Sequence, residues 1–209
     1  MGRYALIVVL ALLLDGCAKG RYGPQDNRDF DRVSQLSELA GLYKNEGDDG
    51  IVNLNFHHYL SEDIWGYNSN ILWGVTGPNL PTGIRHGDIE FIEVSSTENS
   101  LTAKAIKNGC VVYEKTYFAG TDFEIKNGQL VIHKNINLLS RGGQDITVGP
   151  SYEEVTLGID TGKQGKARST LYQAGLVYMF LPIAGTETRD VRFERVSDKP
   201  QGLKACENR

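Results

Sequence analysis

The 209-residue sequence lacks the features that would place it at once in several classes of protein. It has no apolar run of about 20 residues, the length that a helix needs to cross the hydrocarbon of a bilayer. Its charges are of both signs and interspersed, with a net charge of -4, so no basic block predicts nucleic-acid binding. With three cysteines, the core cannot depend on a dense disulfide framework.

Sequence motifs of the common catalytic and metal sites are also missing. There is no G-x-S-x-G elbow, no H-E-x-x-H helix, no C-x-x-C pair and no EF-hand loop. Residues 158–164 have one residue too few between their glycines for a phosphate-binding loop, and they predict a hairpin turn instead. Because no nucleophile, base and orienting group can be assembled, we expect no enzyme, no cofactor and no metal site.

Residues 1–16 have the three parts of a secretory signal peptide. Arg3 lies in a short n-region, residues 5–14 form an apolar run of ten, and the small Gly16 precedes the predicted cleavage. Ten apolar residues are too few to span a bilayer. We therefore expect export and removal of residues 1–16.

The end of this segment resembles the lipobox of bacterial lipoproteins, with Leu14, Gly16 and Cys17 in place and Asp15 departing from the pattern. The resemblance implies lipidation of Cys17 and acylation of the new amino terminus, and several acyl chains anchor a protein durably. By the family's sorting rule, Ala18 implies delivery to the outer membrane. The alternative is ordinary cleavage to a soluble periplasmic or secreted protein with a free Cys17.

The remainder of the chain is of single-domain length. Residues 17–28 have no apolar period and predict a flexible tether that holds the domain off the bilayer. Residues 29–209 are expected to form one β-rich domain that begins with a short helix, from a cap at Asp29 to a stop at Gly41. The helix is predicted from the spacing of Phe30, Val33, Leu36 and Ala40.

After Gly41, apolar residues alternate and turn residues recur, which is typical of an antiparallel all-β domain. The dipeptides Asn108-Gly109 and Asn127-Gly128 predict type I′ hairpins, the second with Ile125 opposite Leu130 on an apolar face. Other strands are predicted at 52–60, 70–75, 88–95 with a bulge at 91–92, 154–160, 167–172, 175–181 and 190–196. A closed up-and-down barrel is preferred and a two-sheet sandwich is the alternative, since both protect strand edges.

Gly41-Leu42-Tyr43, at the start of the β region, is similar to the Gly-x-Trp signature of lipocalins, with Tyr in place of Trp. Thr121-Asp122-Phe123 loosely matches the Thr-Asp-x motif of that family. The resemblance implies a lipocalin-like barrel with an apolar ligand cavity. It also implies that Arg192 or Arg195 packs on Tyr43.

Two further sites are predicted from single residues. If Cys17 is lipidated, Cys110 and Cys206 are left to form a disulfide in an oxidising compartment; the alternative is two free thiols. His58 shares a strand face with Val52, Leu54 and Phe56, and either it is a hydrogen-bonded core residue or it orients a ligand's head group in the cavity. The adjacent His57 points to the opposite face, so the two cannot grip one metal from a regular strand.

Two functions remain open at this point. In the first, a membrane-anchored envelope lipoprotein binds a small apolar or amphipathic ligand in its β domain. In the second, the interior is packed, and the lipoprotein has a structural or interaction role through contact with another envelope protein.

Overall fold

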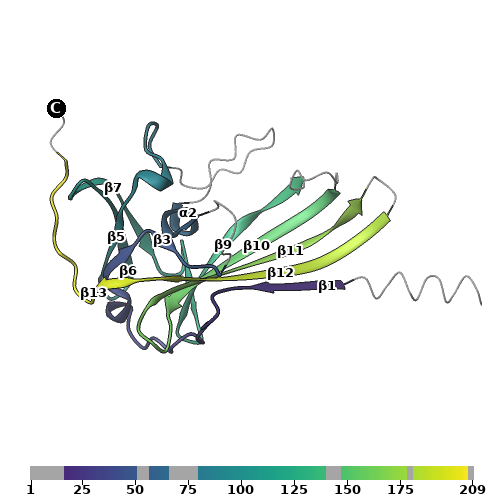
Figure 1. Ribbon diagram of the computed structural model, residues 1–209, viewed down its shortest axis with the longest axis horizontal. Coiled ribbons are helices and arrows are strands. Elements are labelled where there is room, and N and C mark those ends of the chain that lie inside the picture. The colour runs from purple at the N-terminus through teal and green to yellow at the C-terminus, as the bar shows by residue number, and fades with distance from the viewer. Residues whose placement is uncertain (1–16, 51–56, 66–79, 140–146, 178–180, 207–209) are drawn as a thin grey trace, which may run out of the picture.

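The computed structural model describes residues 17–50, 57–65, 80–139, 147–177 and 181–206, which form two β-sheets (Figure 1). One sheet has the order β1 (Cys17–Tyr22), β12 (Leu181–Phe193), β11 (Gly165–Val177), β10 (Thr147–Ile159), β9 (Gln129–Leu139) and β8 (Glu124–Lys126). The other has the order β13 (Arg195–Ser197), β2 (Gly41–Lys44), β5 (Phe91–Ser96), β6 (Ser100–Lys107) and β7 (Cys110–Phe118). The smaller elements are β3 (Glu46–Gly47) paired with β4 (His58–Tyr59), the α-helix α2 (Leu60–Trp65), and the 3-10 helices η1 (Leu36–Leu39) and η2 (His86–Asp88).

The prediction of an all-β domain is confirmed, but the preferred closed barrel is wrong and the sandwich is right. On one side the chain passes between the sheets through Glu194, which separates β12 from β13. On the other side, a tight turn with the single bridge Ala119↔Phe123 separates β7 from β8. Because β8 has three residues, all paired with β9, no described ladder joins it to β7 and the sheets stay separate.

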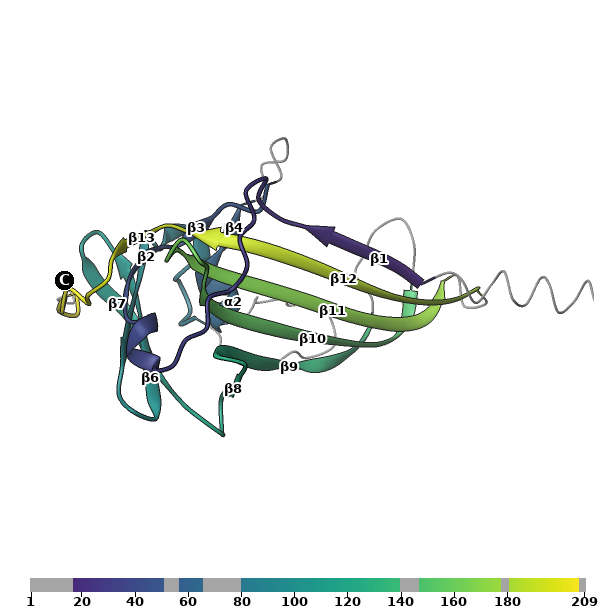
Figure 2. The ribbon, with the colours of Figure 1, turned by 90° about the horizontal axis from the view of Figure 1, so that it is seen from below.

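The two sheets overlap along only part of the longer sheet. Strands β10, β11 and β12 have 13 residues each, whereas β5, β6 and β7 have six, eight and nine. We call residues 129–132, 155–169 and 189–193 with the five-stranded sheet the packed end. The projecting end is the part of the six-stranded sheet that extends beyond the five-stranded sheet (Figure 2). It consists of β1 and residues 133–139, 147–154, 170–177 and 181–188.

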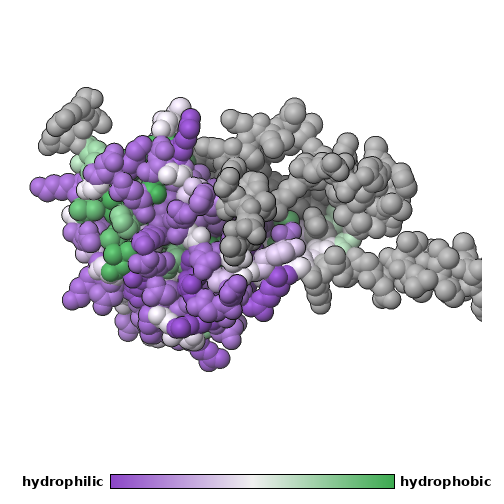
Figure 3. Space-filling model, viewed as in Figure 1, coloured by the Kyte–Doolittle hydropathy of each residue, from purple (hydrophilic) through white to green (hydrophobic). Residues whose placement is uncertain are grey.

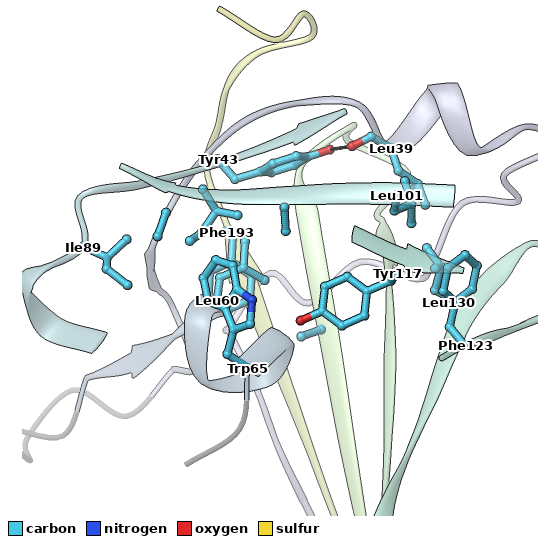
Figure 4. Packing of buried hydrophobic residues seen from close by; sticks show 14 of the residues in the cluster. Leu39, Tyr43, Leu60, Trp65, Ile89, Leu101, Tyr117, Phe123, Leu130 and Phe193 are labelled. Carbon is cyan, nitrogen blue, oxygen red and sulfur yellow. Dashed lines mark hydrogen bonds between the residues drawn. The ribbon is translucent and has the colours of Figure 1, made fainter. Parts of the chain in front are cut away.

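The core lies between the sheets at the packed end. Phe193 of β12 and Ile92 of β5 are fully buried, and so is Trp65 of α2 (Figure 4). The Trp65 ring packs edge-on against Tyr113, with 5.4 Å between ring centroids. Helix α2 therefore fills one end of the sandwich with large apolar side chains.

Asn45 fixes this helix to the sheet. Its main-chain oxygen accepts a hydrogen bond from the N–H of Leu60, and its Oδ1 accepts one from the N–H of Ser61. Its Nδ2 donates to the carbonyls of His86 and Ile89. The predicted strand over 52–60 is thus wrong at its end, where a capped helix begins at Leu60; residues 51–56 lie outside the described residues.

Both predicted hairpins are present. Asn108, Gly109, Asn127 and Gly128 all have positive φ, as type I′ turns require. The second turn pairs residues 126 and 129, as predicted, and Leu130 is buried. Ile125, the partner of Leu130, is 55% exposed because β8 lies at the edge of the sheet. The predicted apolar face is therefore incomplete.

Several strand limits differ from the prediction. Residues 167–172 and 175–181 were expected as two strands, but β11 runs unbroken through Gly175, which pairs with Ile183. β5 pairs regularly with β6, so the expected bulge at 91–92 is absent. The break in the apolar–polar alternation at this point has another cause. Ile92 is buried in the core, and its neighbour Glu93 is buried on the opposite face of β5 by the C-terminal segment. Of the strand predicted over 154–160, residues 154–159 are in β10; the one predicted over 190–196 is divided between β12 and β13, with a break at Glu194. The predicted strand at 70–75 lies outside the described residues.

The helix predicted from Asp29 to Gly41 is wrong in all but its last turn, which is η1. Phe30 bridges to Asp160, and the N–H of Val33 donates to the carbonyl of Gly128. Because one residue is bound at the end of β10 and the other at the turn between β8 and β9, their helical spacing does not produce a helix. Gly41 does not end a helix but begins β2.

Candidate functional site

The segment after the predicted cleavage point is part of the sheet. β1 pairs in parallel with β12, from Cys17↔Ala184 to Tyr22↔Arg189. The prediction of a flexible tether over residues 17–28 is therefore wrong, because backbone pairing holds its first six residues along the edge of the six-stranded sheet. The backbone of Cys17 lies at the projecting end.

A buried ionic cluster holds the residues that follow β1. The Asp190 carboxylate is fully buried and accepts hydrogen bonds from Arg21 (3.1 Å), Asn27 (2.6 Å) and Arg168 (2.6 Å). Lys166 Nζ lies 4.0 Å from it and donates to the Asn27 side chain (2.6 Å) and the Arg28 carbonyl. One carboxylate thus joins three cations from the N-terminal segment and β11.

The cluster shifts the pKa values of its members. Burial raises the pKa of Asp190, but hydrogen bonds from Arg168 and Asn27 and the nearby cations outweigh it, so the net pKa is below 3.8. Burial lowers the pKa of Lys166, and Asp190 offsets only part of that effect. Phe30 lies under both cations, with its ring centroid 5.1 Å from Lys166 Nζ and 5.2 Å from Arg168 Cζ. The N-terminal segment is consequently fixed by charge, hydrogen bonds and aromatic packing together.

Sequence reasoning missed this cluster. Lys166 and Arg168 lie two residues apart on one strand, which places them on the same face, and Asp190 pairs directly with Arg168. The alternation was readable in the sequence, but the register of β11 on β12 and the return of Arg21 were not.

The interior of the sandwich contains a small apolar cavity of about 90 Å³. Tyr43, Tyr117 and Phe193 contribute to its wall, together with Leu60 from α2 (Figure 4). The Tyr43 hydroxyl donates to the Leu39 carbonyl (2.8 Å), and the Tyr117 hydroxyl donates to the Ile64 carbonyl (3.1 Å). Both hydroxyls are therefore already bound to the main chain.

The contact implied by the lipocalin resemblance is made by Arg195. Its guanidinium carbon lies 5.6 Å from the centroid of the Tyr43 ring, and its Nη2 donates to the carbonyls of Glu38 (3.0 Å) and Ala40. Burial raises the pKa of the Tyr43 phenol to about 12, although Arg195 acts in the opposite direction. Arg192 instead pairs with Asp48 and Asp26.

His58 lies against Asp63, 2.9 Å away, and it is not among the residues that line the cavity. Burial lowers the pKa of its imidazole, but the Asp63 carboxylate outweighs burial, so the net pKa is above 6.5. His57 pairs with the exposed Glu46 (2.5 Å), so the two histidines do point in different directions. The geometry gives His58 the role of an ion-paired residue near the core.

Cys110 and Cys206 form a disulfide, with 5.1 Å between their Cα atoms. Residues 204–206 also pair with Val111, and Glu93 accepts hydrogen bonds from the N–H groups of Gln201 and Gly202. Figure 3 shows a hydrophobic patch over the five-stranded sheet, beside this tail, on a surface that is otherwise mostly hydrophilic there. The tail thus closes over the outer face of that sheet, where Leu203 packs on a second apolar cluster.

A second, polar groove has a volume of about 650 Å³. Two ion pairs lie in its wall. Lys44 pairs with Glu194 at 2.6 Å, and Arg192 pairs with Asp48 at 3.0 Å. Its lining carries three cationic and four acidic side chains, so their charges largely cancel and the groove presents little excess charge to a ligand.

Neither the described residues nor the comparisons with known proteins assign a function. No group of three or more potential metal ligands lies together among them. None of the helices in the described ranges is long and apolar enough to cross a bilayer. Comparisons with protein-family models, curated proteins and solved structures find no match for this chain.

Proposed function

We propose that the protein is an envelope lipoprotein, anchored in the outer membrane by acyl chains on Cys17, whose packed β domain acts by contact with another envelope component. The anchor is supported by Leu14, Gly16 and Cys17 in the sequence and by the position of Cys17 at one end of the molecule. Each buried CH₂ of an acyl chain contributes about 0.8 kcal/mol, so several chains give durable attachment.

The size of the interior cavity is the observation that supports contact over carriage of a ligand. Pockets for small molecules have volumes of roughly 300–1,000 Å³. The cavity of about 90 Å³ is several times smaller. In addition, the hydroxyls of Tyr43 and Tyr117 already donate to main-chain carbonyls, so neither has a free proton to donate to a ligand's head group.

Mass spectrometry of the protein purified from membranes of its native host tests the anchor. We expect a chain that begins at Cys17 and carries the added mass of acyl groups. A Cys17→Ser variant, purified in the same way, should lack that mass and leave the membrane fraction. An unacylated wild-type chain that retains residues 1–16 would contradict the proposal.

A second candidate is the binding of a small apolar ligand, and the almost wholly apolar wall of the cavity favours it. An apolar cavity of about 150 Å³ stays dry and takes up a molecule of the size of benzene, so only a smaller ligand fits here. Native mass spectrometry of the same preparation separates the candidates. A ligand that co-purifies at one per chain supports carriage, and a bare acylated chain supports the packed interior.

A further inference from the structure

The register of β1 places the predicted lipidation site beside one particular hairpin. Cys17 pairs with Ala184 of β12, and Ala184 pairs with Ala174 of β11. The last described pair of that hairpin, Val177↔Leu181, lies three residues further out. At about 3.4 Å per residue, this pair is about 10 Å beyond Cys17 along the strands. Figure 2 shows that β1 begins at the same end of the sheet at which β11 ends and β12 begins.

This hairpin is uncharged over the same stretch. In β11, residues 170–177 include no Asp, Glu, Lys or Arg, and neither do residues 181–186 of β12. Charged residues resume toward the packed end, at Arg168 and Glu187. The neighbouring connection between β9 and β10 differs, since the sequence there carries Arg141 and Asp145. Of the two outermost hairpins, that of β11 and β12 is therefore the one whose composition suits an apolar environment.

A row of tyrosines marks the boundary between the uncharged and charged parts. Tyr152 of β10 pairs with Tyr172 of β11, and their ring centroids lie 6.0 Å apart. Tyr172 is 44% exposed and pairs with Thr186, which pairs with Lys19 of β1. This row lies two residues, or about 7 Å, from Cys17 on the side of the packed end. Tyrosine is enriched at membrane–water interfaces because its ring is apolar and its hydroxyl is polar.

We propose that residues 174–177 of β11 and 181–184 of β12 enter the same lipid leaflet as the acyl chains on Cys17, with the Tyr152–Tyr172 row at the interface. The inference rests on the proposed lipid anchor and adds a second contact to it. A reach of about 10 Å beyond Cys17 fits within one leaflet, whose hydrocarbon is about 15 Å thick. Two contacts fix the direction of the long strands and point the packed end away from the membrane.

Tryptophan fluorescence quenched by brominated lipids tests this depth. Val177→Trp and Leu181→Trp place the probe at the hairpin end, and Lys163→Trp places a matched probe in the turn at the opposite end of β11. Each mature protein is purified from host membranes and reconstituted in vesicles of phosphatidylethanolamine and phosphatidylglycerol, with and without bromine on the acyl chains. The wild-type signal from Trp65 and Trp73 is subtracted.

We expect brominated lipids to remove about half or more of the added emission of either hairpin variant and almost none of that of Lys163→Trp, because quenching needs contact with the hydrocarbon. Two hairpin variants guard against one that fails to fold. Acylated, vesicle-bound protein with no quenching at either hairpin position overturns this inference and leaves the lipid anchor intact. If the protein is unacylated, quenching of the hairpin variants still supports the hairpin contact, whereas failure to float with vesicles overturns both proposals.

Discussion

The packed end and the projecting end share the same four strands, β9 to β12, but different interactions stabilise them. At the packed end, Val155, Ala167 and Phe193 are at most 1% exposed beneath the five-stranded sheet and α2. At the projecting end, strand pairing and the added edge strand β1 continue, and Tyr172 is 44% exposed. The strands are thus longer than the core requires. The extra length places Cys17 at one end of the molecule and the sandwich at the other.

Asp190 lies where the two ends meet, and its substitution is expected to have the largest effect. Asp190→Ala leaves Lys166 and Arg168 without their carboxylate in a buried site, which costs about 3–5 kcal/mol of the free energy of unfolding. Urea denaturation measures this loss. Hydrogen exchange should also show faster exchange of the amides of β1, because Arg21 and Asn27 lose their common partner.

Asp88→Asn is the matched control, because Asp88 forms a half-exposed pair with Lys107 and its loss should cost less than about 1 kcal/mol. The depressed pKa of Asp190 adds a pH test. Its stabilising contribution is present above pH 3.8 and is lost as the pH falls through the lower folded-state pKa. Unchanged exchange in β1 of the Asp190→Ala variant would show that the backbone pairing alone holds the projecting edge.

A substitution of Arg195 tests the stability of the packed end without disturbing the projecting end. Arg195→Met removes two hydrogen bonds to the carbonyls of Glu38 and Ala40 and the contact with the Tyr43 ring. Together these are worth about 2–3 kcal/mol in urea denaturation. Arg192→Met, in the same part of the chain, removes partly exposed ion pairs and should cost less than about 1 kcal/mol. Equal losses in the two variants would contradict the role of Arg195.

His58 gives the smallest effect, about 1 kcal/mol, and one that depends on pH. Because the pKa of His58 in the folded protein is above 6.5, its pairing with Asp63 stabilises the fold fully below pH 6.5. That contribution is lost as the pH rises through the folded-state pKa. The difference in unfolding free energy between wild type and His58→Gln should therefore be greatest near pH 5.5 and shrink toward pH 8.

His57→Gln is the control, since its pair with Glu46 is exposed on both sides and should contribute little at either pH. A difference between wild type and His58→Gln that does not change with pH would rule out charge pairing with Asp63. It would leave packing against Phe193 as the role of the His58 ring.

Local features of the sequence predicted the parts of the fold that depend on local chemistry. The Asn-Gly turns need positive φ at adjacent residues, so Asn108 and Asn127 were sufficient to locate both hairpins. The alternation of Val155, Leu157 and Ile159 identified β10, because successive side chains of a strand point to opposite faces of the sheet. The helix predicted over 29–41 was wrong because spacing alone does not show that Phe30 and Val33 bind to two separate turns, at Asp160 and Gly128.

The candidate site was predicted less well than the fold. The disulfide partners followed from there being few cysteines, and Arg195 was one of two arginines named for the contact with Tyr43. The sequence of residues 17–28, expected to be a tether, did not predict β1, because a strand added at a sheet edge needs no apolar pattern of its own. It is held by backbone hydrogen bonds to β12, which any sequence can make.

By itself, the sequence determined the all-β class and the hairpin turns, because turn geometry and alternation act over a few residues. It predicted the pairing of Cys110 with Cys206 only on the condition that Cys17 is lipidated, and the structure contains that disulfide. Only the tertiary structure decided that the sheets stay open, that Arg195 and not Arg192 reaches Tyr43, and that the N-terminal segment is fixed. Arg21 and Asp190 lie 169 positions apart. Their contact depends on the register of β1 on β12, and no local property of either residue encodes it.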